Sequence, residues 1–125
     1  MSAMNDTQTT VEQLKARMAE FVAQREWQKY HRPKNLVMSM AIETAELMEH
    51  FQWVTHEQAD ELLTNPESRQ AVADEMADVL AFLLSLANCL KLDLAAEFER
   101  KMLKNELKYP ADEVRGDYKR PKRER

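Results

Sequence analysis

Apolar positions in this chain recur at intervals of three and four residues, the spacing that places side chains on one face of a helix. Taken in order, the stripes predict five helices, at about 10–24, 36–53, 56–63, 67–90 and 94–108. The stripe of the second helix is Leu36, Val37, Met40, Leu47 and Phe51, and that of the last is Leu94, Phe98, Met102 (or Leu103) and Leu107. The longest stripe belongs to the fourth helix and comprises Val72, Met76, Val79, Leu80, Leu83, Leu86, Ala87 and Leu90. The pattern predicts an all-α protein, an antiparallel bundle of four to five helices.

Turn and cap residues set the expected boundaries of these helices. Asn35 is the expected N-cap of the second helix, Thr55–Gln58 resembles a capping box, and Asp93 can cap the last helix. Residues 25–34 break the apolar pattern and are interpreted as a loop that Pro33 stops.

The polarity of the chain divides it into three parts. Residues 1–10 are polar and are expected to form a flexible N-terminus. Residues 11–110 carry all the stripes and are expected to form one domain. Residues 111–125 form a polar, basic tail, interpreted as solvated chain.

Composition narrows the function classes. The chain has 125 residues, 44% of them apolar and 32% charged, with one Gly and four Pro, which argues against an all-β fold. The net charge of −4 provides no basic field for nucleic acid. No apolar run is long enough for a membrane span, and the N-terminus has no signal-peptide core. The single cysteine, Cys89, lies in an apolar helix, so we interpret it as a core residue of a cytoplasmic protein.

Two acidic pairs stand out on the predicted helices. Glu43 and Glu46 are three residues apart on one helix, and Glu75 and Asp78 are three apart on another. Residues at that spacing share a helix face, so packing of the two helices would bring four carboxylates together. Like charges that close raise one another's pKa or require a counter-charge. Oxygen ligands alone favour Mg²⁺, with Mn²⁺ as the second possibility.

The acids allow two other interpretations. A di-iron carboxylate bundle requires Glu-x-x-His pairs, and none of the three histidines has a glutamate three residues before it. Acidic pairs on surface helices are also common without any ligand. A non-catalytic helical interaction module therefore remains an alternative at this point.

The acids and their neighbours resemble a known family. Their order, ExxE, a spacer and then ExxD, is similar to the signature of the MazG-like all-α nucleoside triphosphate pyrophosphohydrolase superfamily. The likeness is greatest to the dCTP pyrophosphatase group and extends over about 14–116. It is also carried by the segments 21–27, 31–36, 46–53 and 101–110.

The resemblance implies a fold, an activity and an assembly. It implies a helical homo-oligomer, dimeric or tetrameric, with active sites where subunits meet. It implies Mg²⁺-dependent hydrolysis of a nucleoside triphosphate between its α- and β-phosphates, giving the monophosphate and pyrophosphate. The expected substrate is dCTP or a modified dCTP, and the expected role is house-cleaning of the nucleotide pool.

The resemblance also assigns roles to residues of this chain. The expected metal ligands and catalytic residues are Glu43, Glu46, Glu75 and Asp78, with Glu46 a candidate to orient the attacking water. The expected substrate-binding residues are Trp27, Trp53, Phe82, Lys101, Asn105, Lys108 and Tyr109. The two tryptophans would lie near the base, where aromatic rings stack on any nucleobase. Spacings of four and seven place Lys101, Asn105 and Lys108 on nearly one helix face, suited to the β- and γ-phosphates.

Two positions depart from the pattern of dCTP-selective relatives. Met18 stands where some of them have a histidine near the base, and Phe82 stands where some have a tyrosine. Both differences remove a polar group, so a broad or non-cytosine specificity stays open. Separately, stripes this wide bury poorly in a lone subunit of 125 residues, which predicts at least a dimer.

Overall fold

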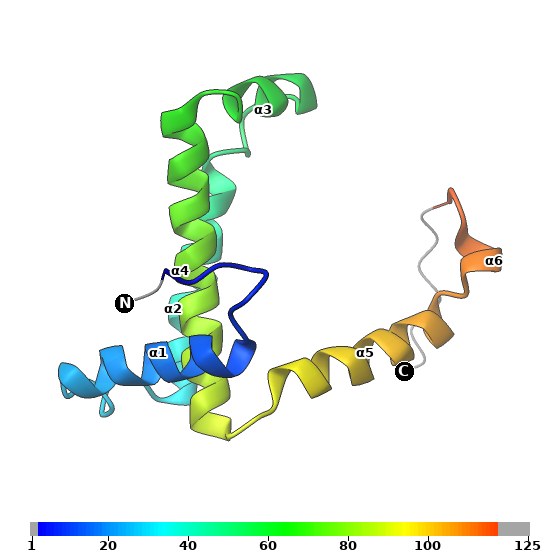
Figure 1. Cartoon of the computed structure of the whole chain (residues 1–125). Coiled ribbons are helices and arrows are strands. Elements are labelled where there is room, and N and C mark those ends of the chain that lie inside the picture. The colour runs from blue at the N-terminus through cyan, green and yellow to red at the C-terminus, as the bar shows by residue number, and fades with distance from the viewer. Residues whose placement is uncertain (1–2, 118–125) are drawn as a thin grey trace. The chain divides into compact units, whose positions relative to one another are not determined.

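The computed structural model describes residues 3–117, which form helices joined by short turns and contain no strand (Figure 1). The helices are α1 (Val11–Gln24), α2 (Pro33–Glu49), α3 (His56–Leu62), α4 (Pro66–Leu90), α5 (Leu94–Lys108) and α6 (Ala111–Val114). The all-α prediction is confirmed. In the same range, no single helix has the length and apolar composition needed to cross a membrane.

The chain divides into two compact units. The first extends to Lys91 and contains α1–α4, and the second begins at Leu92 and contains α5 and α6. In the first unit α4 packs mainly against α2 and also against α1. The chain runs up α2, turns through α3 and returns along α4, so α2 and α4 are antiparallel neighbours (Figure 1).

The core of the first unit is small and lies where these helices meet. Its buried apolar side chains are Val22, Leu36, Val72, Leu84 and Ala87. The prediction that Val37 and Met76 belong to the core is wrong, since these side chains are 50% and 58% exposed. Leu80, Leu83 and Leu90 of the long stripe are exposed as well. The stripe is wider than the surface that α1 and α2 cover.

Two predicted caps, Thr55 and Asp93, are confirmed, and Thr10 is an additional cap. Thr10 caps α1 and forms a capping box with Gln13, and Thr55 forms the same motif with Gln58 at the start of α3. The Asp93 carboxylate accepts a hydrogen bond from the Ala96 backbone N–H at 3.0 Å, which caps α5.

The predicted ends of α2 are wrong at both sides. The helix begins at Pro33, because proline has the φ angle and the missing N–H that suit a first helical position. Asn35 is therefore inside the helix, and its side chain donates to the Tyr30 carbonyl oxygen at 3.2 Å. The helix ends at Glu49 and not at Trp53, which lies in the following turn.

Asn65 lies at the boundary between α3 and α4. It is the N-cap of α4, and its side chain accepts hydrogen bonds from the backbone N–H groups of Glu67 and Ser68 at 2.9 and 3.2 Å. The Asn-Pro pair thus starts the next helix as well as ending the previous one.

Residues 1–10 were predicted to be flexible, and residues 111–125 to form a polar, basic tail. Residues 5–9 form a hydrogen-bonded turn, in which the Thr9 backbone N–H donates to the Asn5 carbonyl oxygen at 2.9 Å. The predicted tail begins with the single turn of α6. Residues 118–125, which hold most of its basic side chains, lie outside the described residues. The three-part division of the chain stays a prediction.

Candidate functional site

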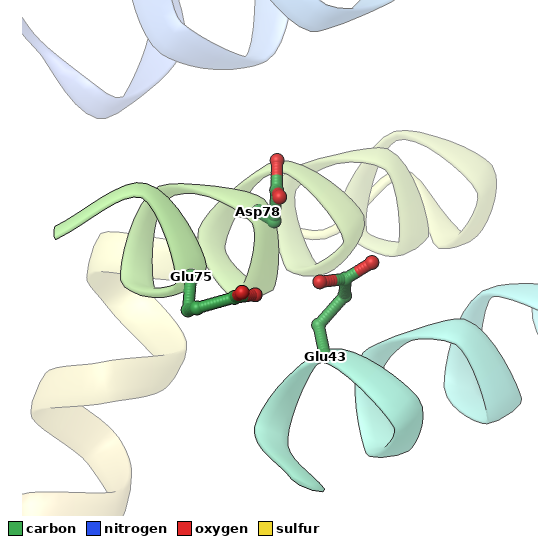
Figure 2. A group of neighbouring side chains, drawn as sticks. All are labelled: Glu43, Glu75 and Asp78. Carbon is green, nitrogen blue, oxygen red and sulfur yellow. The ribbon is translucent and has the colours of Figure 1, made fainter. Parts of the chain in front are cut away.

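Three of the four predicted acids converge between α2 and α4. Glu43 projects from α2, and Glu75 and Asp78 project from adjacent turns of α4 (Figure 2). One carboxylate oxygen from each lies within 4.8 Å of the other two. The i,i+3 spacing on α4 and the packing of α2 against it bring these oxygens together, as the sequence predicted.

The cluster leaves two buried oxygens without a hydrogen-bond partner. These are Oε2 of Glu43 and Oε2 of Glu75. Carboxylates only accept hydrogen bonds, so two of them facing each other cannot satisfy one another unless one holds a proton. Burial raises the pKa of Glu43 to about 7, and the nearby carboxyl groups of Glu75 and Glu46 raise it in the same direction.

A divalent cation fits this donor set. Two unpartnered buried oxygens and a third carboxylate provide hard oxygen ligands of the kind that Mg²⁺ and Mn²⁺ prefer. Glu46, the fourth predicted acid, is exposed and is not one of the three converging groups. Its charge still acts on Glu43, so it lies at the edge of the cluster.

A largely apolar cavity of about 490 Å³ adjoins the cluster. Its lining comes from α1, from the turn after α1 and from α4, and comprises Leu14, Arg17, Met18, Phe21, Trp27, His31, Ala77, Asp78, Ala81, Phe82 and Leu84. Asp78 belongs to both the cavity and the acid cluster. A ligand in the cavity would therefore lie beside the candidate metal site.

Four rings form a continuous series along this cavity. Phe21 meets Trp27 edge to face at a centroid distance of 6.0 Å, and Trp27 is stacked with His31 at 6.4 Å. His31 is in turn stacked with Phe82 at 6.4 Å. Flat aromatic walls of this kind suit a planar heterocycle such as a nucleobase.

The structure separates the two predicted base-binding tryptophans. Trp27 lines the cavity together with Phe82 and Met18, the two positions that depart from dCTP-selective relatives. Trp53 is 86% exposed and is not among the lining residues. Its predicted contact with the base stays a prediction.

The predicted phosphate-binding residues belong to the second unit. Lys101, Asn105 and Lys108 lie on α5, and Tyr109 is its C-cap. Lys108 Nζ lies 5.4 Å from the centre of the Tyr109 ring, which pairs these two neighbours. They form a set along one helix, and their role at the phosphates stays a prediction.

The apolar stripe of α5 was predicted to face inward. Phe98 and Leu103 are more than half exposed and Leu107 is 83% exposed, so the inward prediction is wrong for this chain by itself. The prediction that Cys89 is a core residue is also wrong. Cys89 is exposed, and its thiol donates to the His31 carbonyl oxygen at 3.0 Å.

Sequence reasoning missed several cavity residues. Arg17 and Phe21 lie on α1, and His31 lies in the segment 25–34, which was interpreted as a loop. The sequence feature that could have identified them is the high density of rings in residues 21–31, where Phe, Trp, Tyr and His occur within eleven positions.

The profile of the MazG-like family matches residues 38–120, which include all four acids. The chain belongs to the MazG-like family.

Individual relatives are similar over most of the chain. This chain is 37% identical to human dCTP pyrophosphatase 1 over 102 residues and 34% identical to the Bos taurus protein of the same name over 110 residues. These alignments cover 82% and 88% of this chain. The chain spans 60% and 65% of the length of those two relatives.

A solved structure has a similar fold. The crystal structure of a pyrophosphatase from Archaeoglobus fulgidus matches with a TM-score of 0.75 and 39% identity. The match covers 88% of this chain and 98% of that one.

Proposed function

We propose that this chain is a nucleoside triphosphate pyrophosphohydrolase that requires Mg²⁺ or Mn²⁺ and prefers dCTP or a modified dCTP. The observation that carries the proposal is the convergence of Glu43, Glu75 and Asp78 beside an aromatic cavity, with two carboxylate oxygens buried and unpartnered. The named activity of the similar proteins supports the same reaction.

Different residues of the chain have separate proposed roles. Trp27 and Phe82 would hold the base, and Asp78 would place the α-phosphate beside the cluster, since it borders both regions. Glu43, Glu75 and Asp78 would hold the divalent ion, which when bound neutralises phosphate charge and lowers the pKa of water. Glu46, at the cluster's edge, is the candidate to accept a hydrogen bond from the attacking water.

The proposed reaction is hydrolysis between the α- and β-phosphates. A water oxygen bonds to the α-phosphorus while the bond to the bridging oxygen of the β-phosphate breaks, which gives the monophosphate, pyrophosphate and a proton. Alignment and charge neutralisation supply most of the catalysis in such transfers. Lys101, Asn105 and Lys108 are proposed to contact the β- and γ-phosphates.

We also propose that the working form is a homodimer or homotetramer. Met38 and Ile42 of α2 and Met76 of α4 are large apolar side chains left more than half exposed. A monomer at micromolar concentration by light scattering would contradict this part of the proposal.

The test of the activity is pyrophosphate release from a panel of nucleoside triphosphates with Mg²⁺ or Mn²⁺. Turnover that is highest on dCTP or its 5-modified forms, and that a folded Glu43→Gln variant loses, supports the proposal. Folded protein without turnover on any nucleotide would favour the alternative, a helical interaction module. Turnover without preference for cytosine would support the pyrophosphohydrolase activity and contradict the proposed preference for dCTP.

A further inference from the structure

His31 receives three separate contacts from one face of α4. Its ring stacks with Phe82 at an interplanar angle of 30°, and its Nδ1 lies 2.8 Å from the Ser85 Oγ. Its backbone carbonyl oxygen accepts from the Cys89 thiol at 3.0 Å. Phe82, Ser85 and Cys89 are spaced three and four residues apart, so they share a helix face, and Asp78 lies four residues before Phe82 on the same face.

His31 also stacks with Trp27. The two rings are nearly parallel, at 14°, with centroids 6.4 Å apart. Trp27 follows the end of α1 in a turn, directly after Glu26, whose φ of 52° lies in the left-handed region that non-glycine residues rarely adopt. No regular helix fixes the Trp27 ring, so its place in the cavity depends on its neighbours Phe21 and His31.

The pairing of His31 with Ser85 is specific. Ser85 is 4% exposed, the one buried polar residue of the described chain, and its hydroxyl has His31 as its partner. A buried hydroxyl without a partner would cost free energy, so the pair fixes the ring's position. Burial lowers the pKa of His31, which leaves the ring uncharged at neutral pH and suited to stacking.

We propose that His31 is a positioning residue for nucleotide binding, anchored by Ser85 and setting the place of the Trp27 ring relative to Phe82 and Asp78. This inference rests on the proposed function, because it assigns the cavity to the nucleobase. His31 then affects the affinity for the nucleotide and the preference among bases. The acid cluster is left unchanged, because the described hydrogen bonds and ring contacts of His31 are with Ser85, Cys89, Trp27 and Phe82 and not with the three acids.

The first experiment compares steady-state kinetics of full-length variants on dCTP with Mg²⁺. Ser85→Ala removes the anchor and is expected to raise KM about fivefold, the worth of one hydrogen bond, with kcat within about twofold. His31→Ala also removes the ring and is expected to raise KM about tenfold or more. His31→Phe keeps a flat ring and is expected to recover part of that loss. The Mg²⁺ concentration for half-maximal rate is expected to stay unchanged.

Matched controls are available in the same chain. Ser68→Ala changes a serine in the first turn of α4, and His56→Ala changes an exposed histidine at the start of α3. Both are expected to leave KM unchanged. If Ser85→Ala and His31→Ala also leave KM unchanged, the proposal is overturned. It is equally overturned if kcat falls and the Mg²⁺ concentration for half-maximal rate changes while KM rises, since that is the result of a purely structural role.

A binding measurement separates this proposal from the proposed function. In a Trp53→Phe background Trp27 is the single tryptophan, so its fluorescence reports dCMP binding without turnover. We expect Ser85→Ala to raise the Kd for dCMP by the same factor as KM. A wild type that neither hydrolyses nucleotides nor responds to dCMP overturns both proposals. A hydrolysing wild type with the same dCMP affinity as its Ser85→Ala variant overturns this one alone.

Discussion

The acid cluster and the aromatic cavity share α4 but are built in different ways. The cluster is formed entirely by helical residues, with Glu75 and Asp78 on α4 and Glu43 on α2 facing them (Figure 2). The cavity depends on two rings from the turn after α1: His31, which contacts Phe82 and Ser85 of α4, and Trp27, which stacks with His31. Asp78 is the residue that the two regions have in common.

This difference indicates a division between chemistry and recognition. Carboxylates held on two packed helices have fixed spacing, as metal-assisted phosphoryl transfer requires. Rings held on a turn can vary without disturbing that spacing. Changes in the cluster should therefore reduce kcat, and changes in the cavity should alter KM and base preference.

The largest effect is expected from Glu75→Gln. The amide keeps the shape of the side chain but removes a charge and one carboxylate oxygen that the cation needs, so kcat should fall by about 100-fold or more. Pyrophosphate release measures this. The Kd for dCMP in the cavity should stay within about twofold of wild type.

Glu49→Gln is the control for that change. Glu49 is an exposed glutamate near the end of α2 and is not one of the converging acids, so activity should be retained. If Glu75→Gln weakened dCMP binding as strongly as it reduced kcat, the division between the two regions would fail.

A smaller effect is expected from Trp27→Ala. Loss of a stacking ring should raise KM about tenfold while kcat changes little. Trp53→Ala is the informative partner, because Trp53 is exposed and lies outside the cavity of its own chain. An equal rise in KM for Trp53→Ala would mean that Trp53 reaches the base from a neighbouring subunit, and no rise would remove it from the site.

The same two regions explain what the sequence could predict. Helix spacing is periodic, so Glu43, Glu75 and Asp78 were identifiable from the i,i+3 pattern once α2 and α4 were assumed to pack. Side chains on turns have no such period. His31 was missed because its role depends on Ser85, which is 54 positions away along the chain. Pro33 was interpreted as the end of a loop and is in fact the first residue of α2, since proline is common both in loops and at the first position of a helix.

Core predictions failed for a related reason. Periodicity shows which residues share a helix face, but not whether another element covers that face. Leu36 lies on α2, which packs against α4, and is buried, whereas Met76 and Leu107 share stripes with buried or half-buried residues and remain exposed. Only the packing partners settle which part of a stripe becomes core.

Substitution of Met18 tests how the aromatic cavity recognises the base. Met18 lines the cavity at the position where the resemblance places a histidine in some dCTP-selective relatives. Met18→His adds a hydrogen-bonding group beside the base, and we expect about a threefold increase in preference for dCTP over dTTP. The ratio of kcat/KM values on the two substrates measures it, and an unchanged ratio would show that the base edge does not reach this wall.

The smallest effect is expected in the stability of the metal-free protein. The folded-state pKa of Glu43 is about 7, above the ordinary value of 4.5, so the folded state binds a proton more tightly than the unfolded state. The free energy of unfolding should therefore decrease as pH rises from about 4.5 to about 7 and stay low above that. Mg²⁺ should restore it above pH 7, because the cation replaces the proton among the carboxylates. Urea unfolding in EDTA and in Mg²⁺ tests this, and Glu43→Gln should flatten the dependence while Glu49→Gln preserves it. A Mg²⁺ effect that persists in Glu43→Gln would place the cation outside the cluster and would break the link between the acids and the chemistry.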